Sequence, residues 1–166
     1  MMKSFPVTGV AVVLSVLLTT AAGVEVIQAF HFHTYFLQEN RVKVHEVKEL
    51  RELISKEIAT GGLRNCSLNH LNLGPRGPHP IGSFETCCNV SSLDAATSFF
   101  MKNHGKFSVL LHPLTKQQLK DHTERAMWIG LPMPLDVEIL DPVLDETPIC
   151  PVYGNVSVSY DNGFVQ

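Results

Sequence analysis

The sequence predicts an α+β domain with a ferredoxin-like βαββαβ sandwich, in which two helices cover one face of a four-stranded sheet, followed by an additional C-terminal helix and an extended tail. Strand and helix patterns follow one another in the order β-α-β-β-α-β over residues 30–111. The chain of 166 residues is 45% hydrophobic, which suffices for one core. Five prolines after residue 131 favour an extended chain there, with at most a short strand at residues 137–140.

The N-terminal residues have the three parts of a secretory signal peptide: a positive charge at Lys3, an apolar run over residues 10–18 and small residues at 21–23. A membrane anchor is the alternative, but this run is shorter than the roughly 20 apolar residues that a spanning helix needs. We therefore expect a secreted, extracellular protein that leaves the membrane after cleavage. Its parts would be a signal peptide (1–23), one domain (24–140) and a tail (141–166).

The charge pattern bears on the partners of the protein. The net charge is −3, and no cluster of lysine or arginine is present in the sequence. Nucleic acids and anionic membranes attract proteins that concentrate positive charge, so neither is an expected partner.

The first predicted strand, residues 30–36, carries two histidines two positions apart. Successive side chains of a strand point to opposite faces. His31, His33 and Tyr35 should therefore share one face, while Phe30 and Phe32 pack into a core on the other. We expect the face without helices to hold the functional site.

The remaining elements follow from apolar spacing and from turn residues. Helices are predicted over residues 44–59 and from Ser91 to residues 103–105, the second with Asp94 in a capping box. Strands are predicted at residues 67–71, 83–90 and 107–111, with a loop rich in proline and glycine at residues 74–80. A last helix over residues 116–129 would turn His122 toward the body of the protein, as either a buried core histidine or a functional one.

Four cysteines in an exported chain predict two disulfides, because their spacing does not match a zinc finger. If Leu71 lies opposite Gly82 in an antiparallel pair, Cys66 falls opposite Cys87 and Cys88 is free to bond Cys150. The sequence also contains three glycosylation sequons, which begin at Asn65, Asn89 and Asn155.

The histidines at strand ends and in loops predict a metal site. His31 and His33 share a strand face, His112 ends another strand and His79 lies in the loop. Imidazole is a common ligand of zinc and iron, so these side chains could hold one divalent ion with open positions. Glu85 would either complete the ligand set or orient an imidazole. The alternative for the strand pair is two half-exposed histidines without a ligand.

Four separated motifs resemble the fungal and bacterial DOPA 4,5-dioxygenase family: HFHTYF at residues 31–36, GPHP at 77–80, LHP at 111–113 and DHTERAMWIG at 121–130. The resemblance extends over about residues 30–140. It implies extradiol ring opening of DOPA or a related catechol by ferrous iron and O₂ in a ferredoxin-like domain. The resemblance does not decide whether the protein forms a homodimer. Zn(II) or another divalent metal is the alternative cofactor.

The resemblance also suggests roles for single residues. His31, His33 and His112 would be the metal ligands and His79 the acid/base, with His122 beside it. Arg76 would bind the carboxylate of an amino-acid substrate, and Glu85 would contact the substrate or orient a ligand. The family pattern continues after residues 112–113 with another histidine, where this chain has Leu114. A non-catalytic extracellular protein that binds a metal, a phenol or matrix therefore remains the second functional class.

Overall fold

The computed structural model of the chain describes residues 26–151. The predicted signal peptide and the sequon at Asn155 lie outside the described residues. Between residues 26 and 151, no helix is both long and apolar enough to cross a bilayer.

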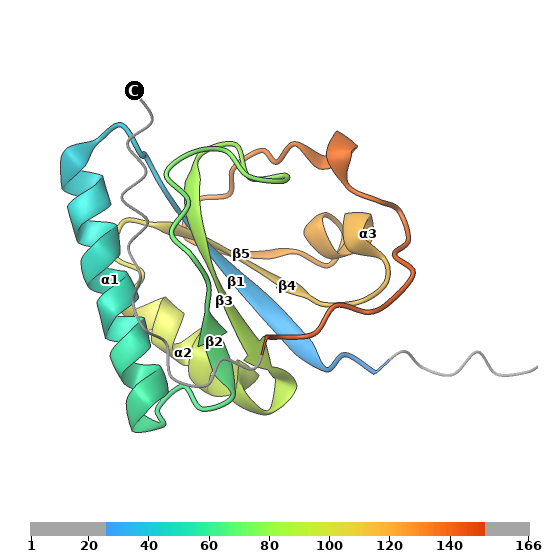
Figure 1. Cartoon of the computed structure of the whole chain (residues 1–166), viewed down its shortest axis with the longest axis horizontal. Coiled ribbons are helices and arrows are strands. Elements are labelled where there is room, and N and C mark those ends of the chain that lie inside the picture. Colours follow the sequence, from blue (N-terminus) through green and yellow to red (C-terminus); the bar gives the residue numbers. More distant parts are fainter. Residues whose placement is uncertain (1–25, 152–166) are drawn as a thin grey trace, which may run out of the picture.

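The described chain forms an antiparallel sheet with two helices on one face, which confirms the predicted α+β class (Figure 1). The strands lie in the order β2-β3-β1-β4-β5. The first four strands in this order give the ferredoxin-like arrangement, and the fifth extends it at one edge. Their bounds are Ala29–Phe36 (β1), Cys66–Leu68 (β2), Gly82–Asn89 (β3), Ser108–Pro113 (β4) and Met127–Ile129 (β5).

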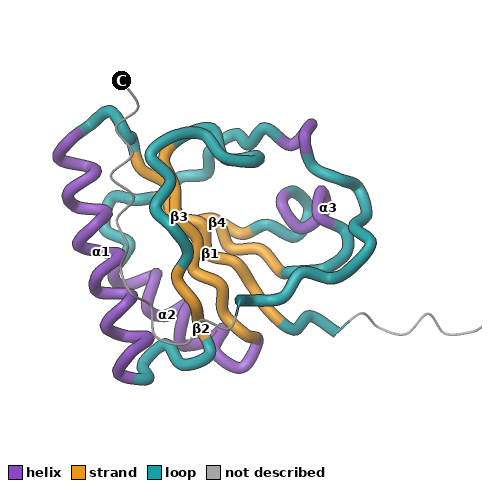
Figure 2. Tube along the Cα trace, viewed as in Figure 1, coloured by secondary structure: helices purple, strands orange, loops and turns teal. Residues whose placement is uncertain are grey.

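Helices α1 (Arg41–Thr60) and α2 (Leu93–Asn103) cover one face of the sheet, and the short helix α3 (Gln118–His122) lies on the other (Figure 2). The side chain of Asn40 caps α1 by accepting hydrogen bonds from the amides of Val42 and Lys43. Gly61 ends α1 with a positive φ of 87°, a conformation that glycine adopts without strain.

The hydrophobic core lies between the sheet and helices α1 and α2. Phe32 of β1 stacks on Phe100 of α2 with ring centroids 4.8 Å apart, and both are fully buried with Ile54 of α1 and Phe84 of β3. The alternation predicted for β1 thus places its phenylalanines toward the helices. Its histidines then face the other side of the sheet.

The predicted helix over residues 116–129 is wrong beyond His122. Helix α3 ends there, a turn follows in which the amides of Thr123 and Arg125 both donate to the carbonyl of Lys120, and residues 127–129 form β5. Strand β5 forms its backbone hydrogen bonds with β4, and the helical spacing of its apolar residues gives no indication of this pairing. The predicted strand near residue 137 is likewise a 3₁₀ helix, Val137–Ile139.

The start of α2 also differs from the prediction. Ser91 lies in a 3₁₀ helix, Val90–Ser92, whose first turn is capped by the side chain of Asn89, and α2 begins at Leu93. The hydroxyl group of Ser91, the residue of the predicted capping box, accepts from the side-chain amide of Asn65 at 3.3 Å. Ser92, which directly precedes α2, makes no side-chain cap and donates to the carbonyl of Arg64, so both hydroxyl groups join the turn before β2 to the start of α2.

The predicted pairing of the cysteines is off by one residue. Cys66 lies opposite Cys88 and is bonded to it, and Cys87 is bonded to Cys150. The predicted register fails because β2 ends at Leu68 and the next bridge, Asn72 with Ser83, lies in a different register. A slip of one residue exchanges the faces of a strand, so it also exchanges the two cysteines.

Candidate metal centre

Five histidines from four segments of the chain meet on the face of the sheet opposite α1 and α2. His31 and His33 come from β1, His112 from β4, His79 from the loop before β3 and His122 from the end of α3. His31 lies directly opposite His112 in the β1–β4 pair, so the two side chains share a face. The structure therefore brings together all five histidines that the sequence singled out.

His33 and His112 form a close histidine pair, with their Nε2 atoms 3.1 Å apart. The Nδ1–H of His112 donates to the carbonyl of Pro113 at 2.8 Å, which leaves the Nε2 lone pair of His112 free. Two nitrogens bound to one ion at about 2.1 Å are roughly 3 Å apart when the bonds meet near a right angle. The observed separation therefore fits a shared metal ion.

His122 offers a second free nitrogen of the same kind. Its Nδ1–H donates to the carbonyl of Gln118 at 3.0 Å, one turn back in α3, so Nε2 keeps its lone pair. Its ring centroid lies 4.0 Å from that of His112 and 6.0 Å from that of His79. His122 thus faces the histidines of the sheet rather than an apolar core.

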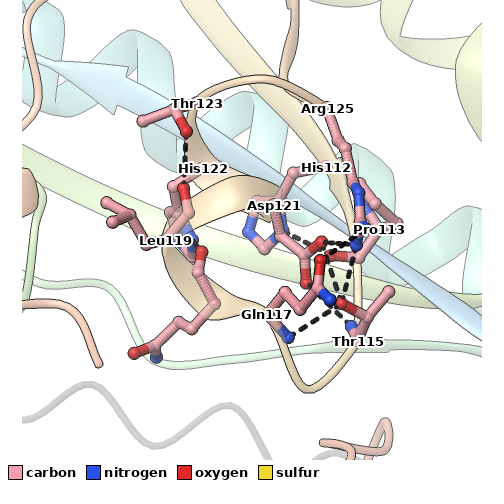
Figure 3. A network of polar contacts seen from close by, with 10 residues as sticks. His112, Pro113, Thr115, Gln117, Leu119, Asp121, His122, Thr123 and Arg125 are labelled. Atoms are coloured by element: carbon pink, nitrogen blue, oxygen red, sulfur yellow. Dashed lines mark hydrogen bonds and ion pairs between the residues drawn. The ribbon is translucent and has the colours of Figure 1, made fainter. Parts of the chain in front are cut away.

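A polar network holds α3 and the end of β4 in place (Figure 3). The buried carboxylate of Asp121 accepts from the amide of Thr115 at 2.8 Å and from Nη1 of Arg125 at 2.9 Å. Arg125 also donates to the side chain of Gln117 at 2.7 Å. Because Asp121 precedes His122, this network sets the position of the His122 ring next to His112.

His79 is positioned by a tight loop and by a tyrosine. Its backbone exchanges hydrogen bonds with that of Arg76, and its Nδ1 lies 2.7 Å from the hydroxyl group of Tyr35. The ring of His79 is 4.1 Å from that of His33. Tyr35 in turn packs against Trp128 of β5 at 5.6 Å. Strand alternation placed Tyr35 on this face, but no role was predicted for it. Trp128 was not recognised either, because the predicted helix over residues 116–129 included it.

Within residues 26–151, three groups of side chains place their ligand atoms within 4.8 Å of one another: His31 with His33 and His112, His33 with His79 and His122, and His31 with Glu85 and Cys87. The first two groups share His33. In the third group Cys87 is bonded to Cys150 and offers no thiolate, so this group does not bind a metal in the oxidised protein.

Burial keeps the histidines neutral. Desolvation, followed by repulsion from neighbouring histidines, lowers the pKa of His31 to about 3 and that of His79 to about 4. The pKa values of His33 and His112 fall well below 6.5 for the same reasons, and that of His122 is also lowered, chiefly by desolvation. Neutral imidazoles are the form that binds metals.

Glu85 borders the histidines at the more open edge of the cluster. Its Oε2 lies 3.2 Å from Nδ1 of His31, and its Oε1 accepts from the side-chain amide of Asn69 at 2.6 Å. Burial raises the pKa of Glu85 to about 7, although the Asn69 hydrogen bond acts in the opposite direction. The position fits an acceptor that orients His31. Asn69 was not recognised from the sequence, which gave no signal for it.

Two further residues that the sequence singled out belong to none of the three ligand groups. The side chain of Arg76 is exposed on the loop, so its predicted contact with substrate stays a prediction. Leu114, where the family pattern has a histidine, is buried in a small apolar cluster with Ala29, Cys87 and Cys150. The sequon residues Asn65 and Asn89 are exposed, and their modification stays a prediction.

A ferredoxin-like sandwich whose open face carries five clustered histidines defines a class of small α+β protein with a potential metal site. The chain belongs to the Dopa 4,5-dioxygenase family, whose model matches residues 30–139. That span includes all five histidines, Glu85 and Arg76.

Two relatives and one solved structure support this membership. The DOPA 4,5-dioxygenase of Amanita muscaria is 34% identical over 136 residues, which cover 82% of this chain and 59% of that protein. An uncharacterised 21.2 kDa protein of Botryotinia fuckeliana is 32% identical over 120 residues, which cover 68% of this chain and 63% of that protein. A crystal structure of a candidate dioxygenase from Nostoc punctiforme matches with a TM-score of 0.59 and 26% identity, covering 68% of this chain and 90% of that one.

The chain spans about three fifths of the length of the two sequence relatives. The histidine cluster and the membership of a dioxygenase family together suggest a bound metal.

Proposed function

We propose that the protein is a metal-dependent extradiol dioxygenase that opens the ring of DOPA or a related catechol. The reaction breaks the bond between a ring carbon that carries a hydroxyl group and its unsubstituted neighbour. Both atoms of O₂ enter the product, so no external reductant is consumed. The observation that carries the proposal is the pair of Nε2 atoms on His33 and His112, which lie 3.1 Å apart beside His31 on a buried sheet face.

His31, His33 and His112 are the proposed ligands. These three side chains come from two neighbouring strands and offer neutral imidazoles to one ion. Three ligands leave positions open for small molecules, as a ring-cleaving site requires. Ferrous iron, when bound there, would bring catechol and O₂ together and make the catechol hydroxyl group more acidic. Zinc suits the same imidazoles, but it has no redox chemistry of its own.

His79 is the proposed base for the phenolic proton. Its low pKa keeps the ring neutral at neutral pH, so it can accept a proton. Acceptance at Nε2 requires that Nδ1 carry the hydrogen and donate it to the oxygen of Tyr35, which lies 2.7 Å away. Burial raises the pKa of Tyr35 above its usual value, so its hydroxyl group stays protonated and serves to hold this tautomer.

Two further residues are proposed to act around the ligands. Glu85 accepts from His31 and fixes the orientation of that imidazole, a partnership common around metal-bound histidines. Arg76 lies three residues before His79 on the same tight loop and would bind the carboxylate of an amino-acid substrate. His122 would hold or transfer a proton beside His112.

One observation favours a second candidate, a non-catalytic extracellular binder on the same scaffold. Leu114 replaces the additional histidine of the family pattern, and it packs on the disulfide that ties residue 150 to β3. An apolar residue packed on a disulfide, in place of one imidazole, would be compatible with a site that binds a metal or a phenol without turnover. Secretion through the predicted signal peptide is part of both proposals.

Anaerobic reconstitution tests both candidates. The mature chain is loaded with ferrous iron without oxygen, and DOPA is then added with air. Oxygen uptake with a ring-opened product that absorbs visible light supports the dioxygenase. Stoichiometric iron without oxygen uptake on any of several catechols supports the binder and contradicts the enzyme. His33→Ala should abolish iron binding, whereas His70→Ala, a change of an exposed histidine outside the cluster, should leave it intact.

A further inference from the structure

The disulfide between Cys87 and Cys150 lies beside His31 and Glu85 on the histidine face. Cys87 is directly opposite His31 in the β1–β3 pair, and Glu85 is two residues away on the same strand face. The ligand atoms of His31, Glu85 and Cys87 lie within 4.8 Å of one another. Cys150, bonded to Cys87 with an S–S distance of 2.02 Å, brings a second sulfur to the same place.

We propose that these four side chains form a second metal site, specific for zinc-like ions, when the Cys87–Cys150 disulfide is reduced. The donor set is then one imidazole nitrogen, one carboxylate oxygen and two thiolates. This combination of soft and borderline ligands suits tetrahedral zinc, unlike the all-imidazole group around His33. The disulfide keeps the second site closed in the oxidised protein.

The redox step balances with a dithiol as the reductant. The dithiol gives two electrons and two protons to the disulfide, becomes a disulfide itself and leaves the two cysteine thiols. A bound divalent ion then displaces both thiol protons, which leave to solvent.

The geometry allows the change. Ligand atoms of a tetrahedral zinc site lie roughly 3.5 Å apart for bonds of about 2.1 to 2.3 Å, so the group within 4.8 Å needs only a small contraction. The two sulfurs must instead move apart by more than about 1 Å from their bonded distance. Cys150 can make this movement because it belongs to a half-buried segment without helix or strand, whereas Cys87 is held in β3.

His31 belongs both to this site and to the group with His33 and His112. A zinc ion bound by Cys87 and Cys150 would therefore use His31 as a ligand, and His31 would no longer be available to the proposed iron site. The redox state of one disulfide would then select which ion the histidine face holds. This consequence depends on the proposed function, but the second site itself does not.

The other disulfide provides a matched control. Cys88 lies in the core on the helix side, and Cys66–Cys88 is in none of the groups of ligand atoms among residues 26–151. The variant Cys66→Ala/Cys88→Ala therefore keeps only the disulfide in question. Cys87→Ser/Cys150→Ser keeps only the control disulfide.

The test uses cobalt(II) as a spectroscopic substitute for zinc. The Cys66→Ala/Cys88→Ala chain is reduced with a dithiol, freed of it without oxygen and titrated with cobalt. We expect near-ultraviolet thiolate-to-cobalt absorption that saturates at one ion per chain and is absent from the oxidised chain. Cys87→Ser/Cys150→Ser should lack this absorption after the same treatment. Absence of the absorption in the reduced chain, or its presence in the serine variant, would overturn the proposal.

A second measurement uses the wild-type chain, so that it does not depend on the alanine variant folding. The fully reduced chain is alkylated with and without zinc, and each cysteine is followed by peptide mass spectrometry. We expect zinc to slow labelling of Cys87 and Cys150 at least tenfold relative to Cys66 and Cys88. Equal protection of all four, or protection of none, would overturn the site. The same holds if the reduced chain is unfolded in the presence of zinc.

Discussion

Nε2 of His33 lies 3.1 Å from Nε2 of His112, although the two residues are 79 positions apart in the sequence. Neighbouring strands β1 and β4 bring them together, and the Pro113 carbonyl orients the second ring. His33 also belongs to the group with His79 and His122. The two groups make different predictions for metal binding.

Replacement of single histidines distinguishes these groups. We expect His33→Ala to lose stoichiometric metal, because His33 belongs to both groups. If His31, His33 and His112 are the ligands, His79→Ala should retain the metal while His31→Ala loses it. The loss of metal affinity in His31→Ala should exceed the roughly 10- to 100-fold loss that is typical when a residue hydrogen-bonded to a metal ligand is replaced. Metal content after desalting measures this, and retention of metal by His31→Ala together with loss in His79→Ala would reverse the assignment.

Tyr35→Phe should affect turnover rather than metal binding. The variant keeps the ring that packs on Trp128 but removes the hydroxyl group next to His79. We expect unchanged iron content and a fall in kcat of about tenfold, smaller than the roughly 100-fold or greater loss expected for His79→Ala. The acid limb of the pH–rate profile should also move, because the partner of Nδ1 is gone. An unchanged profile would argue against a role for Tyr35 in setting the tautomer.

Glu85→Gln should weaken metal binding through His31. The amide keeps the size of the side chain and can still accept at its oxygen, but it removes the negative charge that stabilises the Nδ1–H of His31. We expect metal affinity to fall about 10- to 100-fold. Glu49→Gln, in the exposed pair with His45, is the control and should leave affinity unchanged. Equal affinities in the two variants would contradict the orienting role of Glu85.

The metal-free protein should lose stability in acid. The five clustered histidines have folded-state pKa values below 6.5, with His31 at about 3 and His79 at about 4. Below about pH 6.5 the unfolded chain binds protons that the folded chain does not, so the free energy of unfolding falls as the pH falls. Each such proton contributes about 1.4 kcal/mol per pH unit.

Glu85 acts in the opposite direction. Its folded-state pKa of about 7 lies above the unfolded value of 4.5, so its contribution to stability grows as the pH falls between these values. One carboxyl group cannot offset five imidazoles, and the net slope should follow the histidines. Urea denaturation of the metal-free chain at several pH values between about 7.5 and 5 measures this. A stability that stays level or rises over that range would contradict neutral, buried histidines.

Asp121→Ala should destabilise the protein and displace His122. The change leaves the Thr115 amide and the Arg125 guanidinium without their carboxylate partner. We expect a loss of about 2 to 3 kcal/mol in the free energy of unfolding, because charge-assisted hydrogen bonds are lost at a buried site. Asp145→Ala is the control, since the described contact of Asp145 with Lys116 uses its backbone carbonyl. Equal effects of the two changes would contradict the anchoring role of Asp121.

The sequence alone was enough for the elements that depend on local periodicity. Alternation along β1 correctly separated His33 and Tyr35 from Phe32, and the order of the first six elements gave the ferredoxin-like class. The prediction from sequence failed where pairing between distant segments overrides local spacing. Residues 123–129 have helical spacing, yet pairing with β4 turns their last part into a strand. The spacing of the cysteines could not distinguish two registers of β2 that differ by one residue.

What the sequence determined by itself is therefore which side chains share a face and which family motifs they form, because both are properties of neighbouring residues. The tertiary structure alone decided which partner each side chain meets. It placed Cys87 rather than Cys88 beside His31, Asn69 on Glu85 and Tyr35 on His79. These contacts join residues 16 to 56 positions apart, and they exist only once strand pairing has fixed the register of the whole sheet.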